Sequence, residues 1–206
     1  MLTRFADLRI SAKLGGVLLL CTLLVAVVVV TAVAQLTAAQ GRAEAVDGRL
    51  GSVSAIAEVR AEMLVVRSDV LRVVLAAPDE KDAAVQTLTA DVDQLDQDWT
   101  AYQASEPATP AAQRTALWDA VGAWGTLRDQ SVELAKAGDT EGYNALRDEK
   151  VTPAADAAFS TLAAVQEAET TAADDLVAAG EAAHTRSLVL FVAVALVGLA
   201  VVLVLG

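Results

Sequence analysis

The stretch LGGVLLLCTLLVAVVVVTAVA, residues 14–34, decides how the rest of the chain is interpreted. It carries no charged residue, and a helix of that length covers roughly 30 Å, the thickness of the hydrocarbon core of a bilayer. A second uncharged run, residues 188–205, is slightly shorter and still long enough for one span. The sequence therefore predicts two transmembrane helices with a longer polar segment between them.

The first run has one rival interpretation, a secretory signal peptide, because the small residues Ala32 and Ala34 precede Gln35 as they would at a cleavage site. Its apolar core is longer than the ~7–15 residues of a typical signal peptide, which favours a helix that stays in the membrane. A mature N-terminus at Gln35, found by N-terminal sequencing, would remove this first span.

Charge is spread unevenly over the chain, whose formal net charge is −12. The 13 residues ahead of the first run hold three bases and one acid, whereas residues 35–186 hold 12 bases and 26 acids. Because Lys and Arg concentrate on the cytoplasmic side of a membrane, the basic flank places the acidic segment outside. Such an acidic segment gains nothing from a phosphate backbone, so we expect no nucleic-acid partner.

These patterns divide the chain into four parts of a multi-pass protein of the cytoplasmic membrane. We expect a cytoplasmic lead at 1–13, a first transmembrane helix at 14–34, an extracytoplasmic domain at 35–186 and a second transmembrane helix at 187–206. Membrane lipid is therefore an expected partner.

Helix-stopping residues cut the outer segment into four helices. Pro78 cannot extend the first helix, and Asp79 can cap the second, which should run to about Ser105. Thr109 and Pro110 stand where a cap and a first helical residue would open the third helix.

The third helix should end at Gly138 and Asp139, and Thr140 should open a fourth helix that Pro153 kinks. Apolar residues recur at alternating steps of three and four in every piece, which is the seam of an antiparallel bundle. The second helix is the clearest case, with Val85, Leu88, Val92, Leu95, Trp99 and Tyr102. We predict an all-α, up-down four-helix bundle of long–short–short–long helices flanked by two transmembrane helices.

Near the membrane only the two long helices remain, and small residues fill both of them there. One hypothesis is that a second copy completes this stem and that the fourth helix slides along it. Residues 63–75 support a homodimer through the first helix, because nine of these 13 residues are apolar, a wider arc than one bundle seam requires. The alternative is that alanine is simply common in helices.

Two phrases add a resemblance to this plan of spans and helices. DQDWTAY at 96–102 and AGDTEGYNALRDEKVTP at 137–153 resemble a tryptophan–tyrosine stripe and a Gly-Asp turn before the proline of the last helix. In these features the chain resembles the sensory half of a bacterial methyl-accepting chemotaxis receptor of the four-helix-bundle class.

The resemblance implies a homodimeric receptor for a small molecule outside the membrane, sensed directly or through a periplasmic-type binding protein. It implies that an axial shift of the fourth helix and second span reaches a cytoplasmic signalling domain. No such domain follows Gly206, so we expect a fragment or a truncated protein. The same module on a sensor histidine kinase or a cyclic-dinucleotide synthase, and a ligand-free structural bundle, stay open as alternatives.

Arginines of the first helix are the first candidate ligand-binding residues, namely Arg60, Arg67 and Arg72. The resemblance implies that they grip carboxylates, so the ligand would be an anion held by guanidinium groups. The alternative is that they are rim residues paired with the acids Glu58, Glu62 and Asp69.

Trp99 and Tyr102 share a helical face and are the second candidates, although a heptad stripe more often belongs to the core. The acid run DVDQLDQD at 91–98 lacks the glycine and spacing of a calcium loop and is interpreted as a solvated face. The single His184 cannot build a zinc site or a nucleophile–base pair. We therefore expect no metal, no cofactor and no enzyme.

Overall fold

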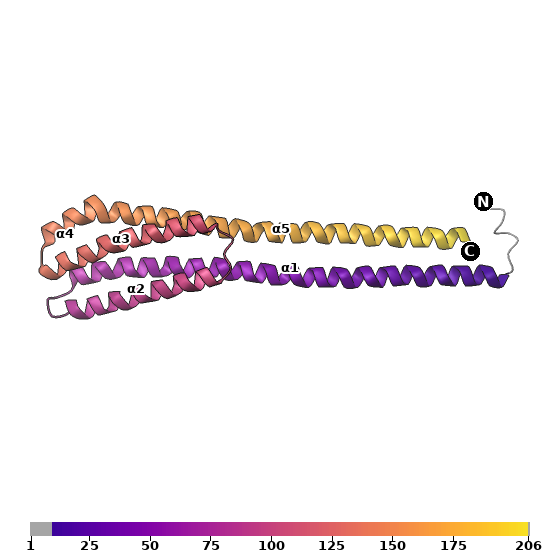
Figure 1. Cartoon of the computed structure of the whole chain (residues 1–206), viewed down its shortest axis with the longest axis horizontal. Helices are drawn as coiled ribbons and strands as arrows, with labels where there is room; N and C mark the ends of the chain where they lie inside the picture. The colour runs from indigo at the N-terminus through magenta and orange to yellow at the C-terminus, as the bar shows by residue number, and fades with distance from the viewer. Residues whose placement is uncertain (1–9, 206) are drawn as a thin grey trace. The chain divides into compact units, whose positions relative to one another are not determined.

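The computed structural model describes residues 10–205, and all elements in that range are helical (Figure 1). In chain order they are α1 (Ile10–Leu75), α2 (Lys81–Ala104), α3 (Ala111–Ala137), α4 (Thr140–Leu146), the π-helix η2 (Arg147–Val151) and α5 (Thr152–Leu205). With 66, 24, 27 and 54 residues in α1, α2, α3 and α5, the long–short–short–long pattern and the all-α fold class are confirmed.

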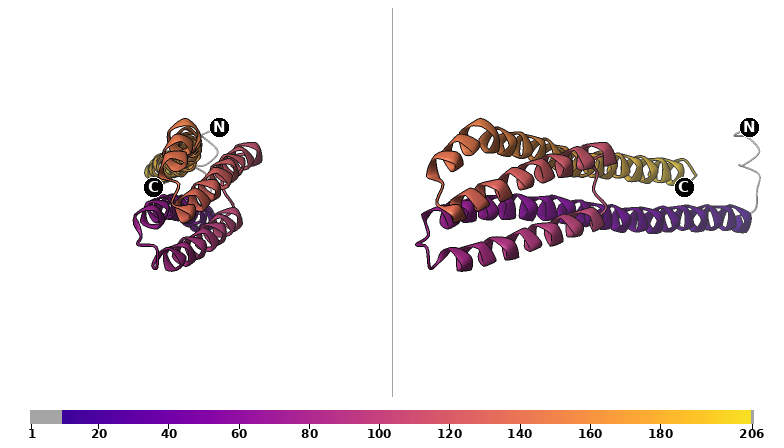
Figure 2. Two further views of the ribbon diagram at one scale, coloured as in Figure 1. Left: turned by 90° about the vertical axis from the view of Figure 1, so that its left-hand side faces the viewer. Right: turned by 60° about the vertical axis from the view of Figure 1, so that its left-hand side comes forward.

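The chain divides into two compact units. The bundle unit is Val46–Asp175. In this unit α2 lies along α1, and α3 lies along the fourth helical segment, which consists of α4, η2 and the first part of α5 (Figure 2). The second unit holds the part of α1 up to Ala45 and the part of α5 from Leu176. Each of the helices α1 and α5 is continuous and contributes residues to both units.

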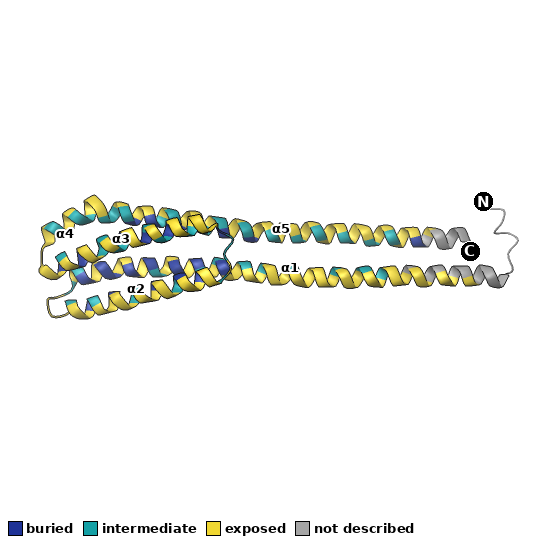
Figure 3. Ribbon diagram, viewed as in Figure 1, coloured by how far each residue is buried: buried dark blue, intermediate teal, exposed yellow. Residues whose placement is uncertain are grey.

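A continuous apolar core explains why four separate helices form one bundle. Buried positions face inward along each helix, as Figure 3 shows in dark blue. Each fully buried Val, Leu or Met side chain contributes about 1.5–3 kcal/mol by leaving water. The largest of these side chains repeat at steps of three and four, as the sequence predicts: Ile56, Val59, Met63, Val66, Leu117, Trp124, Leu162 and Val165.

The predicted helix boundaries are confirmed, but two predicted caps are wrong. Asp79 lies outside α2, whose N-cap position is taken by Glu80 without any side-chain hydrogen bond. Likewise Pro110 occupies the N-cap position of α3, and the hydroxyl of Thr109 donates elsewhere in the bundle, to Glu169. At the start of α2 the N–H groups of Glu80 and Lys81 donate to Ala77 O, so two donors are satisfied without a side-chain cap. At the start of α3 the contact with Glu169 occupies the Thr109 hydroxyl.

The end of α3 follows the prediction closely. Gly138 adopts the left-handed φ of +74°, and its N–H donates to Ala135 O while Asp139 N–H donates to Leu134 O. The Asp139 side chain then accepts from Gly142 N–H at 2.9 Å and caps α4. Glycine is the residue that takes this backbone conformation without steric cost, so the turn between α3 and α4 is built by one residue.

The expected kinked fourth helix is instead three consecutive pieces, α4, η2 and α5. Thr140 opens α4 as predicted, and the π-helix lies directly ahead of Pro153, with Thr152 N–H donating to Arg147 O. Proline lacks an N–H and crowds the preceding turn, and a wider turn relieves both constraints.

Outside the bundle, α1 and α5 expose large apolar side chains such as Leu19, Val30 and Val189. Each of the two helices contains a window long and apolar enough to cross a membrane. In this second unit the Ser187 hydroxyl donates to Gln35 Oε1 at 2.7 Å, at the start of one apolar run and the end of the other. The two helices fit a membrane protein, because lipid is the surrounding in which such a surface is stable.

Candidate functional site

The three candidate arginines lie in three different surroundings along α1. Arg60 Nη1 donates to Gln166 Oε1 at 3.3 Å, and Arg72 Nη1 lies 2.5 Å from Asp69 Oδ1. The Arg67 guanidinium lies over the Phe159 ring, 5.9 Å from its centroid, and forms no ion pair within residues 10–205. The alternative interpretation, in which each arginine pairs with a neighbouring acid, therefore holds for Arg72 but not for Arg60 or Arg67.

Of these three arginines, Arg67 lines a small cavity between α1, α3, η2 and α5, and its side chain is itself exposed. The cavity measures about 130 Å³, and its polar lining groups are Arg67, Tyr143, Arg147 and Thr152. Apolar side chains of α1, α3, η2 and α5 close it, namely Val70, Leu71, Trp124, Val151 and Ala155. A cavity of about 150 Å³ holds benzene, so this space suits a small molecule of that size.

A second guanidinium reaches the same cavity from η2. Arg147 lies over the Tyr143 ring at 5.7 Å and donates from Nε to Asp148 Oδ1 at 2.8 Å. The arginine lowers the pKa of the Asp148 carboxyl through this hydrogen bond. Two cations beside one small space, each held over an aromatic face, form an arrangement that can bind a carboxylate.

The candidate aromatics Trp99 and Tyr102 lie in the core, away from this cavity. Trp99 stacks on Trp118 with ring centroids 4.7 Å apart and planes 5° from parallel. The buried Tyr102 hydroxyl donates to Glu169 Oε1 at 2.8 Å, and burial raises the pKa of this tyrosine so that it stays a donor. The structure therefore does not bring the five candidate residues together; the binding role of Arg67 stays a prediction.

Glu169 is a central polar residue that the sequence patterns did not single out. Its side chain is 0% exposed, and besides Tyr102 it accepts from Ala108 N–H at 3.0 Å, Thr109 N–H at 2.9 Å and the Thr109 hydroxyl at 2.7 Å. Burial raises the pKa of Glu169, but these hydrogen bonds outweigh it and leave the pKa lowered. The available signal was its position, since Leu162, Val165 and Glu169 continue the core spacing of α5.

The loop that Glu169 holds also contacts α1. Ser52 Oγ donates to Ser105 O at 2.7 Å, and Arg49 Nη1 donates to Glu106 O at 2.7 Å. Glu106 has a φ of +56°, a left-handed conformation that a non-glycine residue adopts only where its surroundings hold it. The α2–α3 loop thus connects the two long helices of the bundle by hydrogen bonds.

The acid run at 91–98 is only partly a solvated face. Asp93 and Asp96 are exposed, as predicted, whereas Asp91 and Asp98 are half-buried against α1. The correction has a simple reason: residues 91 and 98 are seven apart, and with Leu95 between them they follow the seam of α2.

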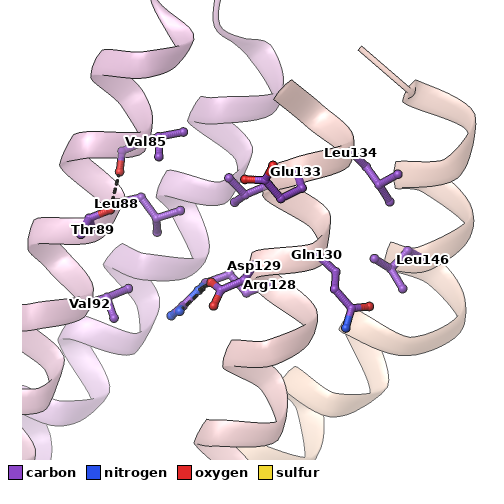
Figure 4. A pocket seen from close by; sticks show the side chains of 11 residues that line it. Val85, Leu88, Thr89, Val92, Arg128, Asp129, Gln130, Glu133, Leu134 and Leu146 are labelled. Carbon is purple, nitrogen blue, oxygen red and sulfur yellow. Dashed lines mark hydrogen bonds and ion pairs between the residues drawn. The ribbon is translucent and has the colours of Figure 1, made fainter. Parts of the chain in front are cut away.

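A larger cavity lies between α2 and α3, as Figure 4 shows. It measures about 950 Å³ and is lined mainly by apolar side chains of α2, by Leu134 and Leu146, and by Arg128. The Arg128 side chain is only 11% exposed and pairs with its neighbour Asp129 at 2.8 Å. This cavity is a groove with one cationic group, Arg128, which contacts Asp129 through both Nε and Nη2, whereas Arg147 contacts Asp148 through Nε.

A family model described as "Tar ligand binding domain homologue" matches residues 4–173, which include all of α1, α2, α3, α4 and η2 and the first part of α5. No curated protein and no solved structure matches the chain.

Proposed function

Since this chain belongs to the family of Tar ligand binding domain homologues, we propose that its bundle binds a small carboxylate outside the membrane and transmits binding through α5. A chemoreceptor sensory module is what the family and the four-helix fold support. The observation that carries the ligand class is the cavity shared by Arg67 and Arg147.

The cavity lies at the start of α5, the helix that would carry the signal to the membrane. Thr152 and Ala155, which line it, belong to the first turn of α5. The same helix continues to Leu205 through the second apolar run. A ligand that pulls on η2 and the first turn of α5 would move the end of a helix that enters the membrane, as a small axial or rotational shift.

A homodimer through α1 is the second part of the proposal. Leu64, Leu71 and Leu75 are exposed and are spaced seven and four residues apart, so they share one face of α1. Exposed apolar residues at heptad spacing are typical of a helix–helix interface. Disulfide trapping between copies that carry single cysteines along residues 60–75, in a Cys21→Ser background, tests it; no crosslink on this face would exclude the dimer.

The proposed orientation, with residues 35–186 outside and the basic lead inside, rests on the distribution of Lys and Arg. Protease added to spheroplasts should cut the bundle and spare an N-terminal tag. The opposite result would invert the topology and remove the receptor interpretation.

Calorimetry on the full chain in dodecyl maltoside micelles tests the ligand class. The probes are acetate, succinate, aspartate and benzoate, each with its amide, because only the carboxylate gains from a guanidinium. We expect at least one carboxylate to bind and Arg67→Gln to weaken it by about 10–100-fold, as for a lost charge-assisted hydrogen bond of about 1.5–3 kcal/mol.

Two variants locate the bound probe. Arg60→Gln is the matched control, because Arg60 lies on the same helix outside the cavity. Arg128→Gln reports on the groove between α2 and α3. Loss of binding in Arg128→Gln alone would move the site to that groove, and the absence of heat with every probe would favour a ligand-free structural bundle.

A further inference from the structure

Four carboxyl groups face one another across the contact between α1 and α2. Glu62 and Asp69 are seven residues apart on α1, and Asp91 and Asp98 are seven apart on α2. Because the two helices run in opposite directions, the matching spacings let the acids of one helix face those of the other, and Asp91 lies within hydrogen-bond reach of Asp69. We call these residues the acidic quartet.

Asp69 is the buried member of the acidic quartet. Its side chain is 1% exposed, among the buried Val66, Val70 and Val73 of the same helix face. Arg72 approaches Oδ1 from the surface and is itself 59% exposed. Asp69 Oδ1 has only this ion pair with Arg72, and Oδ2 has no hydrogen-bond partner in residues 10–205, so burial of this carboxylate is only partly compensated.

Asp91 faces Asp69 at hydrogen-bond reach. Burial, then the contact with Asp91, raise the pKa of Asp69 to about 6, although the nearby Arg72 acts in the opposite direction. Glu62 responds in the same way: burial raises its pKa, and the charges of Asp91, Asp98 and Asp69 raise it further. Two carboxylates in contact cannot both stay ionised at low cost, and one shared proton converts their repulsion into a hydrogen bond.

We propose that Asp69 and Asp91 form a proton-binding site through which acidity outside the membrane strengthens the contact between α1 and α2. That the proton acts as a stimulus from outside rests on the proposed sensory function and orientation. Proton binding itself depends only on the bundle. The charged groups that face the pair are Glu62 and Arg72 on α1 and Asp98 on α2, and Gln94 Nε2 donates to Asp98 Oδ1 at 2.7 Å.

A proton fits the geometry better than a metal ion. Within the described residues no three acidic, histidine or cysteine side chains converge to hold a metal ion. A hydrogen-bonded carboxyl pair needs only two oxygens in contact and suits an apolar surrounding, where hard cations would need several oxygen ligands.

Thermal unfolding of the full chain in dodecyl maltoside, followed by tryptophan fluorescence from pH 4.5 to 8, tests the site. The native state holds a proton at Asp69 up to about pH 6, whereas the unfolded state releases it near 3.8. The wild-type Tm should therefore fall as the pH rises through this window. Asp69→Asn should remove that component and raise the Tm at pH 7.5 by several degrees.

Asp93→Asn is the matched control, because Asp93 is an exposed acid on the same helix as Asp91. Asp91→Asn is the second test: without its partner's charge, the fall in Tm should move to lower pH. Identical pH profiles in Asp69→Asn, Asp91→Asn and Asp93→Asn would overturn the proposal. So would a rise in Tm with CaCl2 at pH 7.5 that Asp69→Asn abolishes, since the acidic quartet would then be a cation site.

The outcome is independent of the ligand test. A chain that shows the Asp69-dependent pH step but binds no carboxylate probe would refute the proposed ligand and keep the proton site. A chain that binds a carboxylate through Arg67 without that step would keep the proposed function and refute the proton site.

Discussion

Replacing Glu169 by glutamine should destabilise the bundle more than any other change of similar size. The wild-type carboxylate accepts four hydrogen bonds: Oε1 from Tyr102 Oη, Thr109 N–H and the Thr109 hydroxyl, and Oε2 from Ala108 N–H. A glutamine can keep its oxygen at the Oε1 position. Its NH2 group then faces the Ala108 N–H, so two donors meet.

The magnitude follows from those four contacts. One charge-assisted hydrogen bond is lost, worth about 1.5–3 kcal/mol, and the other three become neutral and weaker. A loss of about 3 kcal/mol is expected. With a urea m-value of about 1–3 kcal/mol/M, the unfolding midpoint should fall by about 1–3 M.

Tryptophan fluorescence of the full chain in dodecyl maltoside during urea titration is a suitable assay, because all three tryptophans, Trp99, Trp118 and Trp124, lie in the bundle unit. Glu167→Gln is the control, since Glu167 is an exposed acid on the same helix. If the midpoints of the two variants agree to within about 0.3 M at pH 7, the hydrogen bonds to Glu169 do not stabilise the bundle.

The same carboxylate sets a pH dependence opposite in sign to that of Asp69. The pKa of Glu169 is lowered in the folded state, so its stabilisation is fully present above the unfolded pKa of about 4.5 and is lost as the pH falls below it. The difference in unfolding midpoint between wild type and Glu169→Gln should therefore shrink as the pH falls below about 4.5.

Three smaller changes test the turn and the core. Gly138→Ala places a Cβ at φ +74° and should cost about 1–2 kcal/mol, seen as a lower Tm. Gly142→Ala would drive a Cβ into Asp139 Oδ2 and break the α4 cap, a loss of about 1 kcal/mol in urea titration; Gly122→Ala, where a Cβ meets nothing, is its control. Trp118→Ala removes the stack on Trp99, so the near-ultraviolet circular dichroism of the tryptophans should weaken and stability should fall by about 2 kcal/mol.

The sequence predicts the bundle well because its helix stops and its core spacing are local signals. Gly138 ends α3, and the run from Val85 to Tyr102 shows its apolar face without any knowledge of the partners. Caps were less predictable, because the Thr109 hydroxyl can either accept from a backbone N–H at the start of α3 or donate to a carboxylate, and it donates to the buried Glu169 of α5. A local pattern cannot contain a contact between residues 60 positions apart.

Polar residues inside the core are the part that sequence patterns miss. Glu169 and Asp69 occupy core positions of their helices, yet a hydrophobic pattern treats a carboxylate as a surface residue. The candidate cavity shows the same limitation. The sequence identifies Arg67 as an arginine of the first helix, but Arg147 reaches the cavity because of the π-helix between α4 and α5, which the sequence pattern does not predict.

The π-helix also fixes the angular phase between α4 and α5. Tyr143 and Ala155 are both buried, although 12 residues separate them. At about 100° per residue, an unbroken α-helix would turn the two side chains about 120° apart. The wider turn at Arg147–Val151 absorbs about one residue, and therefore about 100° of this rotation. One additional residue thus lets the tyrosine before the turn and the alanine after it face the same core.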